Sequence, residues 1–430
     1  MLDFQRILIA GTGPASIQMA VMLKNRMNCR IGIVGRPSGR SIPFFSALKQ
    51  NDRQIQVYIQ NEKHHPFQGE CRLDQTFHGY DTVSGEWDTV ILAVTADAYI
   101  AALSQLKDEV LQHIRCVVLL SPTFGSSTII HHFMNDRQIH AEIISFSTYL
   151  GDTRWENGPS NRVITTGVKK KVFIGSALPT SPNVEVLREI YMQSGILLEV
   201  MNSPLEAETR NISLYVHPAL FMNDFSLNVI FGEATTQKYV YKLFPEGPIT
   251  QHLIQNMLAA WKEISAITEK LGLNSVNLLK FMTHDNYPVR PESLSSRDID
   301  CFVQLEAVHQ EYLLYVRYAS LLIDPFSEPD QNGKYFDFSA VPIRPIFINK
   351  EGCWDIPRMP KEDYYRIKII QGIARHLDLD CPTIDQFIAT YERYLKVAAL
   401  KLTGECLSEA FTIQSFAEDI ERICKEIRII

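Results

Sequence analysis

Two hydrophobic patterns alternate along the first half of the chain. Short apolar runs of the length of buried β-strands are separated by segments in which apolar residues recur at helical spacing. The strand-like runs are 6–10, 29–34, 54–59, 87–94, 116–120 and 141–146, and the clearest helical segments are 17–23, 99–111 and 128–135. Strands that alternate with helices predict a parallel sheet with right-handed crossovers, so we expect an α/β fold with an N-terminal Rossmann-type domain.

The pattern changes beyond residue 160. Two strand-like runs, 163–168 and 169–175, predict a hairpin, and a helix at 184–194 and a strand at 196–201 complete the first domain. Residues 202–204 resemble a domain boundary, which predicts domains at 1–203 and 204–430. The second domain is predicted to be mainly helical, with helices at 205–230 (broken at His217-Pro218), 252–271, 276–282, 298–322, 361–377, 383–400 and 415–430, and an aromatic- and proline-rich excursion at 324–357.

Composition narrows the class of protein. The 430 residues carry 42 basic and 49 acidic side chains, a formal net charge of −7, which argues against a broad nucleic-acid surface. No apolar run is long enough to cross a bilayer, and no signal-peptide pattern precedes the first strand, so we expect a cytoplasmic protein. The eight cysteines form no CxxC pair, which predicts reduced thiols and no metal site.

A glycine turn follows the first strand. The segment Gly11-Thr12-Gly13-Pro14-Ala15 joins an apolar strand to an apolar helical pattern, as in the turn that receives a dinucleotide diphosphate. Ser16 stands where a third glycine is usual. The alternative is a strand–turn–helix connection that needs glycine only for its backbone angles.

Three polar residues follow the second strand. Arg36, Ser38 and Arg40 lie where an NAD-preferring enzyme usually carries an acidic residue for the ribose 2′-hydroxyl. A guanidinium binds a 2′-phosphate instead, so we predict NADPH, the alternative being solvated loop arginines. Thr95 and Pro122 follow later strands, where they contact the cofactor or only terminate the strands.

Long sequence runs resemble a known family, the opine metallophore dehydrogenases of the staphylopine dehydrogenase type. The resemblance covers nearly the whole chain. Its strongest runs are 11–14, 95–99, 121–125, 145–154, 208–211, 214–218, 239–248 and 335–342.

The resemblance implies a reaction and a set of site residues. The family carries out an NADPH-dependent reductive condensation of an α-keto acid (pyruvate or 2-oxoglutarate) with the primary amine of a histidine-derived aminobutanoyl intermediate. The product is a nicotianamine-like metallophore, so the metal belongs to the product and not to catalysis. The family's catalytic pair corresponds to Asp152 and His217, and its 2′-phosphate-binding arginine to Arg36, with Arg40 an approximate counterpart of a second basic residue. Members of the family are usually homodimers.

Several interpretations stay open. Arg154 and Arg210 are candidates for binding substrate carboxylates, but either one would equally well pair with Glu206 or Glu208; Tyr241 is a further candidate for the amine pocket. Without the resemblance, a lone histidine before proline is more often structural. Other functions compatible with the sequence are an NADPH-dependent opine or keto-acid reductase of different substrate range and a non-catalytic NADP(H)-binding sensor.

Overall fold

The computed structural model describes residues 4–156, 158–232, 236–286, 292–320 and 339–427. The chain divides into two compact units, Met1–Asn211 and Ile212–Ile430. The first unit thus continues beyond the boundary predicted at 203. It does so because helix α7 (Pro204–Thr209) packs against strands β8 and β11 of the first unit.

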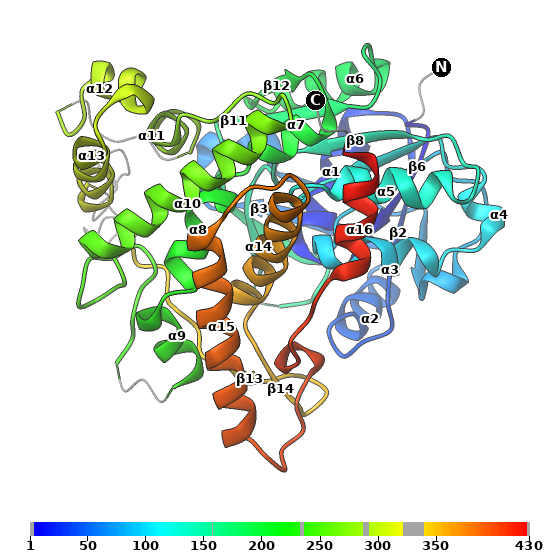
Figure 1. Ribbon diagram of the computed structural model, residues 1–430. Helices are drawn as coiled ribbons and strands as arrows, with labels where there is room; N and C mark the ends of the chain where they lie inside the picture. The colour runs from blue at the N-terminus through cyan, green and yellow to red at the C-terminus, as the bar shows by residue number, and fades with distance from the viewer. Residues whose placement is uncertain (1–3, 157, 233–235, 287–291, 321–338, 428–430) are drawn as a thin grey trace. The chain divides into compact units, whose positions relative to one another are not determined.

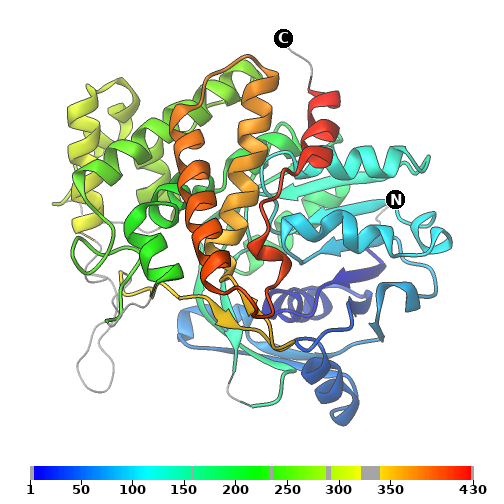
Figure 2. The ribbon, with the colours of Figure 1, turned by 60° about the horizontal axis from the view of Figure 1, so that its bottom comes forward.

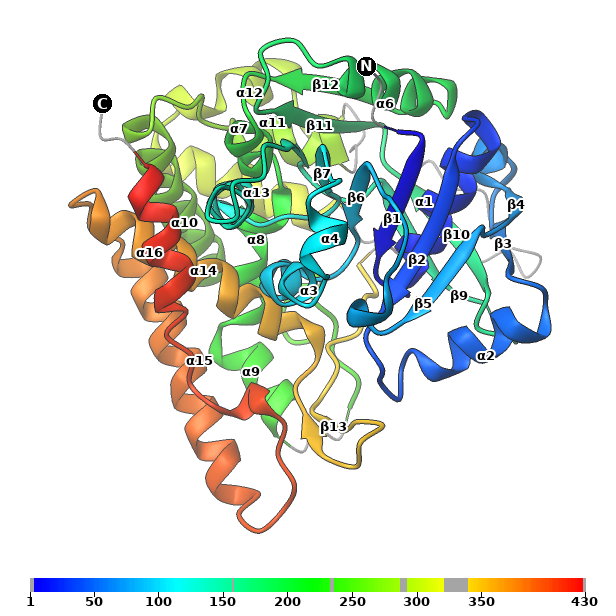
Figure 3. The same cartoon turned by 90° about the vertical axis from the view of Figure 1, so that its right-hand side faces the viewer.

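A large, mostly parallel sheet forms the centre of the first unit (Figures 1 and 3). Its strand order is β12 (Leu197–Met201), β11 (Lys171–Ser176), β8 (Glu142–Phe146), β7 (Cys116–Leu119), β6 (Thr89–Leu92), β1 (Arg6–Ala10), β2 (Arg30–Gly35) and β5 (Gln75–His78). Only the β8–β11 pair is antiparallel. The predicted α/β class with a Rossmann-type sheet is confirmed.

Helix α1 (Pro14–Arg26) lies between this sheet and a second one. It contacts β1 and β2 on one side and all four strands of the small sheet on the other. The small sheet has the order β4 (Gly69–Arg72), β3 (Gln54–Ile59), β10 (Arg162–Val168) and β9 (Gly151–Trp155). Because both faces of α1 are covered, all residues from Ser16 to Leu23 are buried.

The hairpin predicted at 163–175 is wrong. Strand β10 pairs with β3 and β9 in the small sheet, whereas β11 pairs with β8 and β12 in the large one. The chain changes sheets at Lys169, whose backbone N–H donates to the Leu150 carbonyl. Alternation along a strand reports which side chains are buried, but it does not report which strand is the neighbour.

The remaining helices of the first unit connect the strands. They are α2 (Ile42–Gln50), α3 (Tyr99–Ser104), α4 (Asp108–Leu111), α5 (Ser126–Asn135) and α6 (Pro182–Gln193). Short 3₁₀ turns occur at Glu62–Phe67, Tyr80–Thr82 and Ala96–Ala98. Helices α5 and α7 both pack against β8.

The second unit is mainly helical. Its helices are α8 (Ile212–Phe221), α9 (Asp224–Phe231), α10 (Gln251–Lys270), α11 (Leu278–Lys280), α12 (Ser296–Cys301), α13 (Ala307–Ala319), α14 (Arg358–His376), α15 (Pro382–Lys401) and α16 (Ala417–Glu426), with a π-helical turn at Phe281–Asn286 and 3₁₀ turns at Phe302–Gln304 and Glu409–Phe411. Helices α14 and α15 run side by side (Figure 2).

Two predicted helical segments of this unit differ in the structure. The segment 205–230 does not break at His217-Pro218, because Pro218 lies inside α8; the breaks fall between α7, α8 and α9. Of the segment 298–322, residues 321 and 322 lie outside the described residues, and the rest is divided between two helices, α12 and α13, separated by a 3₁₀ turn. Of the predicted excursion at 324–357, residues 324–338 lie outside the described residues, and the rest contains the short strands β13 (Phe347–Ile348) and β14 (Trp354–Asp355).

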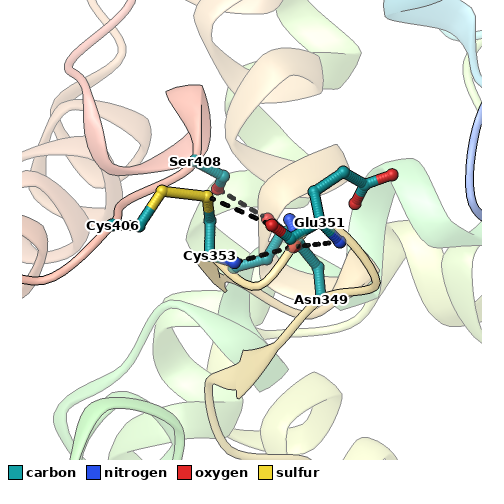
Figure 4. The surroundings of a disulfide bond; sticks show 6 residues. Asn349, Glu351, Cys353, Cys406 and Ser408 are labelled. Atoms are coloured by element: carbon teal, nitrogen blue, oxygen red, sulfur yellow. Dashed lines mark hydrogen bonds between the residues drawn. A yellow bond between two sulfur atoms is a disulfide. The ribbon is translucent and has the colours of Figure 1, made fainter.

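A disulfide joins Cys353 to Cys406 in the second unit, so these two thiols are not reduced as predicted (Figure 4). The pair is 53 residues apart in sequence, but the backbone brings it together, because the Trp354 N–H donates to the Cys406 carbonyl. The Asn349 side chain accepts from the N–H groups of Glu351 and Cys353 and so shapes the turn before β14.

Across the described residues, no helix combines the length and apolar character needed to cross a membrane.

Candidate active site

The glycine turn after β1 has the features of an anion-binding helix start. Gly11 has a φ of +132°, and a Cβ there would lie 2.7 Å from the Ala93 carbonyl oxygen, so the position requires glycine. Gly13 is the N-cap of α1, and a Cβ placed on it would meet no atom within 4 Å. No side chain caps this helix and its first turn holds no acidic residue, so the Thr12–Ala15 backbone and the helix dipole fit a diphosphate.

Ser16 is accommodated by packing. Its side chain is fully buried at the first turn of α1, and its hydroxyl has no hydrogen-bond partner. The hydroxyl oxygen lies 3.1 Å from where a Cβ of Gly11 would stand. The serine therefore fills the space under the turn without capping the helix.

Arg36 begins a turn that one buried serine organises. The Ser41 hydroxyl donates to the Arg36 carbonyl at 2.7 Å and accepts from the Ser38 N–H at 3.1 Å. Arg36 and Arg40 are exposed, whereas Ser38 is half-buried. The backbone is thus held at the end of β2 while the Arg36 guanidinium projects into solvent, an arrangement that fits a 2′-phosphate.

Thr95 and Pro122 follow β6 and β7, as predicted for residues at the carboxyl ends of parallel strands. The Thr95 carbonyl accepts from the Ala98 N–H at 2.9 Å and starts a 3₁₀ turn. Pro122 is buried in the loop that leads into α5. Both positions lie along the same edge of the sheet as the glycine turn.

Asp152 lies on β9 and forms a local charge pair in the first unit. Its carboxylate is 2.5 Å from Arg154 and accepts from the Thr166 hydroxyl at 2.9 Å. The side chains of Arg154 and Asp152 are 65% and 47% exposed, so both groups remain accessible to a ligand. Arg210 is less accessible, because it pairs with buried Glu206 at 3.4 Å.

In the second unit, His217 has a buried carboxylate beside it. His217 Nδ1 lies 3.4 Å from an Asp363 carboxylate oxygen, and the side chains are 18% and 0% exposed. Asp363 also forms an ion pair with buried Arg366. The structure gives His217 Nδ1 and Asp363 Oδ2 no hydrogen-bond partner, so the two groups lie side by side in a charge contact without a formed hydrogen bond. A carboxylate in this place fits a group that would orient the imidazole and favour its protonated form.

Asp363 is absent from the residues predicted from the sequence. The available signal was its place in the α14 pattern: it precedes Ile367 by four residues and Ile370 by seven, so it shares their buried face. An acidic residue on an apolar stripe needs a partner, and here two are present, His217 and Arg366.

Tyr241, the last of the predicted substrate-binding candidates, is half-buried in the segment between α9 and α10. Among the described residues, no group of three or more His, Cys, Asp or Glu side chains is arranged to hold a metal ion.

Comparison with solved structures identifies the class. The fold matches yersinopine dehydrogenase with NADP⁺ bound, with a TM-score of 0.91 and 27% identity over 98% of both chains. It also matches octopine dehydrogenase in complex with NADH and agmatine, with a TM-score of 0.61 and 14% identity over 98% of this chain and 95% of that one, which shows the shared fold. The protein is an opine-type dehydrogenase.

The sequence comparisons define the family more narrowly. The family model described as staphylopine dehydrogenase matches residues 5–427. Staphylopine synthase of Staphylococcus aureus is 47% identical over 427 residues, which are 99% of this chain and 98% of that protein. The chain belongs to the staphylopine dehydrogenase family, and the predicted resemblance is confirmed.

Proposed function

We propose that the protein is an NADPH-dependent opine dehydrogenase that condenses an α-keto acid with a primary amine to form a metallophore. The keto acid is pyruvate or 2-oxoglutarate, and the amine is that of a histidine-derived aminobutanoyl intermediate. The observation that carries the proposal is the His217–Asp363 pair, a candidate acid–base group in a chain of this family. The metal is cargo of the product and takes no part in the reaction.

The first unit supplies the cofactor site. The Gly11–Ala15 turn would hold the diphosphate and Arg36 the 2′-phosphate, with Ser38 and Arg40 beside it and Thr95 and Pro122 toward the nicotinamide. NADP⁺ in yersinopine dehydrogenase supports this assignment. Bound NADPH supplies the hydride that reduces the imine.

His217 manages the protons of the condensation. The amine must lose a proton to attack the keto carbon, and the resulting carbinolamine must gain one to release water. An imidazole performs both transfers near neutral pH, and the Asp363 carboxylate holds its ring in position and stabilises the protonated form. Asp152 is the second catalytic candidate, and Arg154, Arg210 and Tyr241 are candidates for binding the substrates.

The test is NADPH oxidation with each keto acid, with and without the amine, followed by mass spectrometry of the product. The proposal expects turnover only when both substrates are present and a product mass equal to their condensation and reduction. Keto-acid reduction without amine would instead indicate a different reductase. Tight NADPH binding without turnover on any pair would indicate a sensor. The homodimer that the family resemblance implies is tested separately, by light scattering after size-exclusion chromatography.

A further inference from the structure

A buried carboxylate in the first unit has no part in the mechanism above. Glu208 of α7 is 0% exposed. It accepts from the backbone N–H groups of Ser127 at 2.7 Å and Gly125 at 2.8 Å, and from the Ser145 hydroxyl at 2.9 Å. The Ser127 hydroxyl is a fourth hydrogen-bond donor. All four donors are neutral groups.

Glu208 occupies the N-terminus of α5. Gly125 is the N-cap residue of that helix and has a φ of 87°, a left-handed conformation that turns its N–H toward the carboxylate. The unpaired N–H groups and the dipole of α5 therefore act on the protein's own carboxylate. Helix α1 differs, because no side chain occupies its N-terminus.

The same carboxylate connects three segments of the first unit. It joins α7, the last helix of the unit, to β8 through Ser145 and to the loop Ser121–Gly125 through Gly125. This loop follows β7 and contains Pro122, one of the proposed cofactor contacts. The loop also has a local hydrogen bond, in which the Thr123 N–H donates to the Ser126 hydroxyl at 3.0 Å.

We propose that Glu208 is a positioning residue for the cofactor: its carboxylate fixes the Ser121–Gly125 loop against β8 in the shape that receives the nicotinamide half. The proposal rests on the proposed function for the identity of the ligand. Loss of the negative charge weakens the attachment of the loop, because a neutral acceptor binds the N–H groups of a helix start less strongly.

The charge of Glu208 is sensitive to pH near neutrality. Burial raises the pKa of its carboxyl to about 7, while the hydrogen bonds from Ser127, Ser145 and Gly125 oppose the rise. Charged side chains on the packed elements are engaged elsewhere: Glu206 with Arg210, Glu142 with Ser176 and Asn183, Lys171 with Glu199, and His132 with Asp136; His131 is bonded to Asn135. The pH response of the loop is therefore assigned to Glu208.

The test measures binding of NADPH and NADH by fluorescence from pH 6 to 9. NADH is included because it lacks the 2′-phosphate, which titrates in the same range. In the wild type, both dinucleotides bind more tightly as pH rises through about 7. Glu208→Gln weakens both about tenfold at pH 8, because the amide has one acceptor oxygen and no charge, and it removes the pH step of NADH binding. With NADPH, the variant keeps only the step of the 2′-phosphate. The preference for NADPH is unchanged, since it depends on Arg36.

Two further variants complete the test. Glu142→Gln removes another buried carboxylate of the same unit and leaves the pH step in place. Ser145→Ala keeps the Glu208 charge but removes one donor, so the midpoint of the step moves to higher pH. If Glu208→Gln does not fold, the midpoint measured in Ser145→Ala still tests whether Glu208 is responsible for the pH dependence of dinucleotide binding.

Wild-type affinity and an unchanged pH step in Glu208→Gln, or an unmoved midpoint in Ser145→Ala, would overturn the role of Glu208 and leave the proposed function standing. A pH step that Glu208→Gln abolishes, in a protein that turns over no keto acid and amine pair, would overturn the proposed function alone. A wild type that binds neither dinucleotide would overturn both.

Discussion

At the scale of single residues, the chemistry depends on how each charged side chain is held. Asp363 is fully buried between His217 and Arg366, whereas Asp152 is half-exposed beside Arg154. A buried, fixed carboxylate suits orientation of an imidazole, and an accessible one suits contact with a ligand. We therefore expect the two acids to have separable roles.

His217 is expected to be indispensable for turnover. His217→Ala should lower kcat by about 100-fold or more, since a positioned acid–base group contributes roughly 10²–10⁴-fold. Asp363→Asn should lower kcat by a smaller factor, because the imidazole stays but loses its orienting charge. Dissociation constants for NADPH should be unchanged in both variants. The matched control is His252→Ala, an exposed histidine on α10. Near-normal kcat in His217→Ala would contradict the mechanism.

Asp152 is tested separately. If it contacts the reacting groups, Asp152→Asn should lower kcat about tenfold or more, whereas loss of its pair with Arg154 alone should have little effect, because exposed pairs contribute about 0–1 kcal/mol. The measurement is steady-state kinetics with saturating NADPH. Thr166→Val serves as the control, since it removes only the hydroxyl that donates to Asp152. Turnover retained by Asp152→Asn would exclude Asp152 from catalysis.

Arg36 is expected to set the cofactor preference. Arg36→Ala should weaken NADPH binding by about 10- to 100-fold, the range expected for loss of charged hydrogen bonds, and should leave NADH binding unchanged. Arg72→Ala removes an exposed arginine elsewhere in the same unit and should change neither affinity. Equal weakening of both dinucleotides would show that Arg36 does not contact the 2′-phosphate.

At the scale of elements, the local sequence patterns predicted individual strands and helices better than they predicted which strands pair with one another. Seven of the eight strands of the large sheet and helices α10, α14 and α15 were predicted closely, because a buried strand or an amphipathic helix carries its own periodicity. Strand β5, a short strand at the edge of that sheet, was not predicted. The small sheet was missed, since β3 and β10 meet only after more than 100 residues of chain. Asp363 was missed for a related reason: its partner His217 lies on a different helix, and pairing of distant polar groups leaves no local pattern.

The Cys353–Cys406 disulfide is an element-scale constraint, because it closes a long loop between β14 and the segment after α15. A disulfide that closes a loop of this length is expected to stabilise the folded state by up to about 4 kcal/mol, because it restricts the unfolded chain. Cys406→Ser, or reduction of the wild type, should therefore lower Tm by several degrees and leave NADPH affinity unchanged. Cys301→Ser is the control, since Cys301 is a free thiol. An unchanged Tm would argue that the bond contributes nothing to stability.

At the scale of the whole molecule, we expect the free energy of unfolding to depend on pH through one half-buried amine of the first unit. Lys169 lies where the chain passes from β10 to β11, and its ammonium donates to the Thr148 hydroxyl at 3.2 Å. Burial lowers the pKa of this amine from 10.5 to about 8. The run Lys169–Lys171 thus contains one amine that folding desolvates.

The sign of the effect follows from proton binding. Between about pH 8 and 10.5 the unfolded chain holds a proton that the folded chain has released, so the free energy of unfolding rises with pH across this window. Lys169→Met removes the titrating group. The variant should be more stable than the wild type by about 1–3 kcal/mol at pH 7, and this difference should shrink as pH rises toward 10. Urea denaturation at pH 7, 8, 9 and 10 measures it, and Lys170→Met, which removes an exposed neighbour, should leave the pH dependence unaltered. If Lys169→Met keeps the wild-type slope, then Lys169 retains its proton in the folded protein and burial has not depressed its pKa.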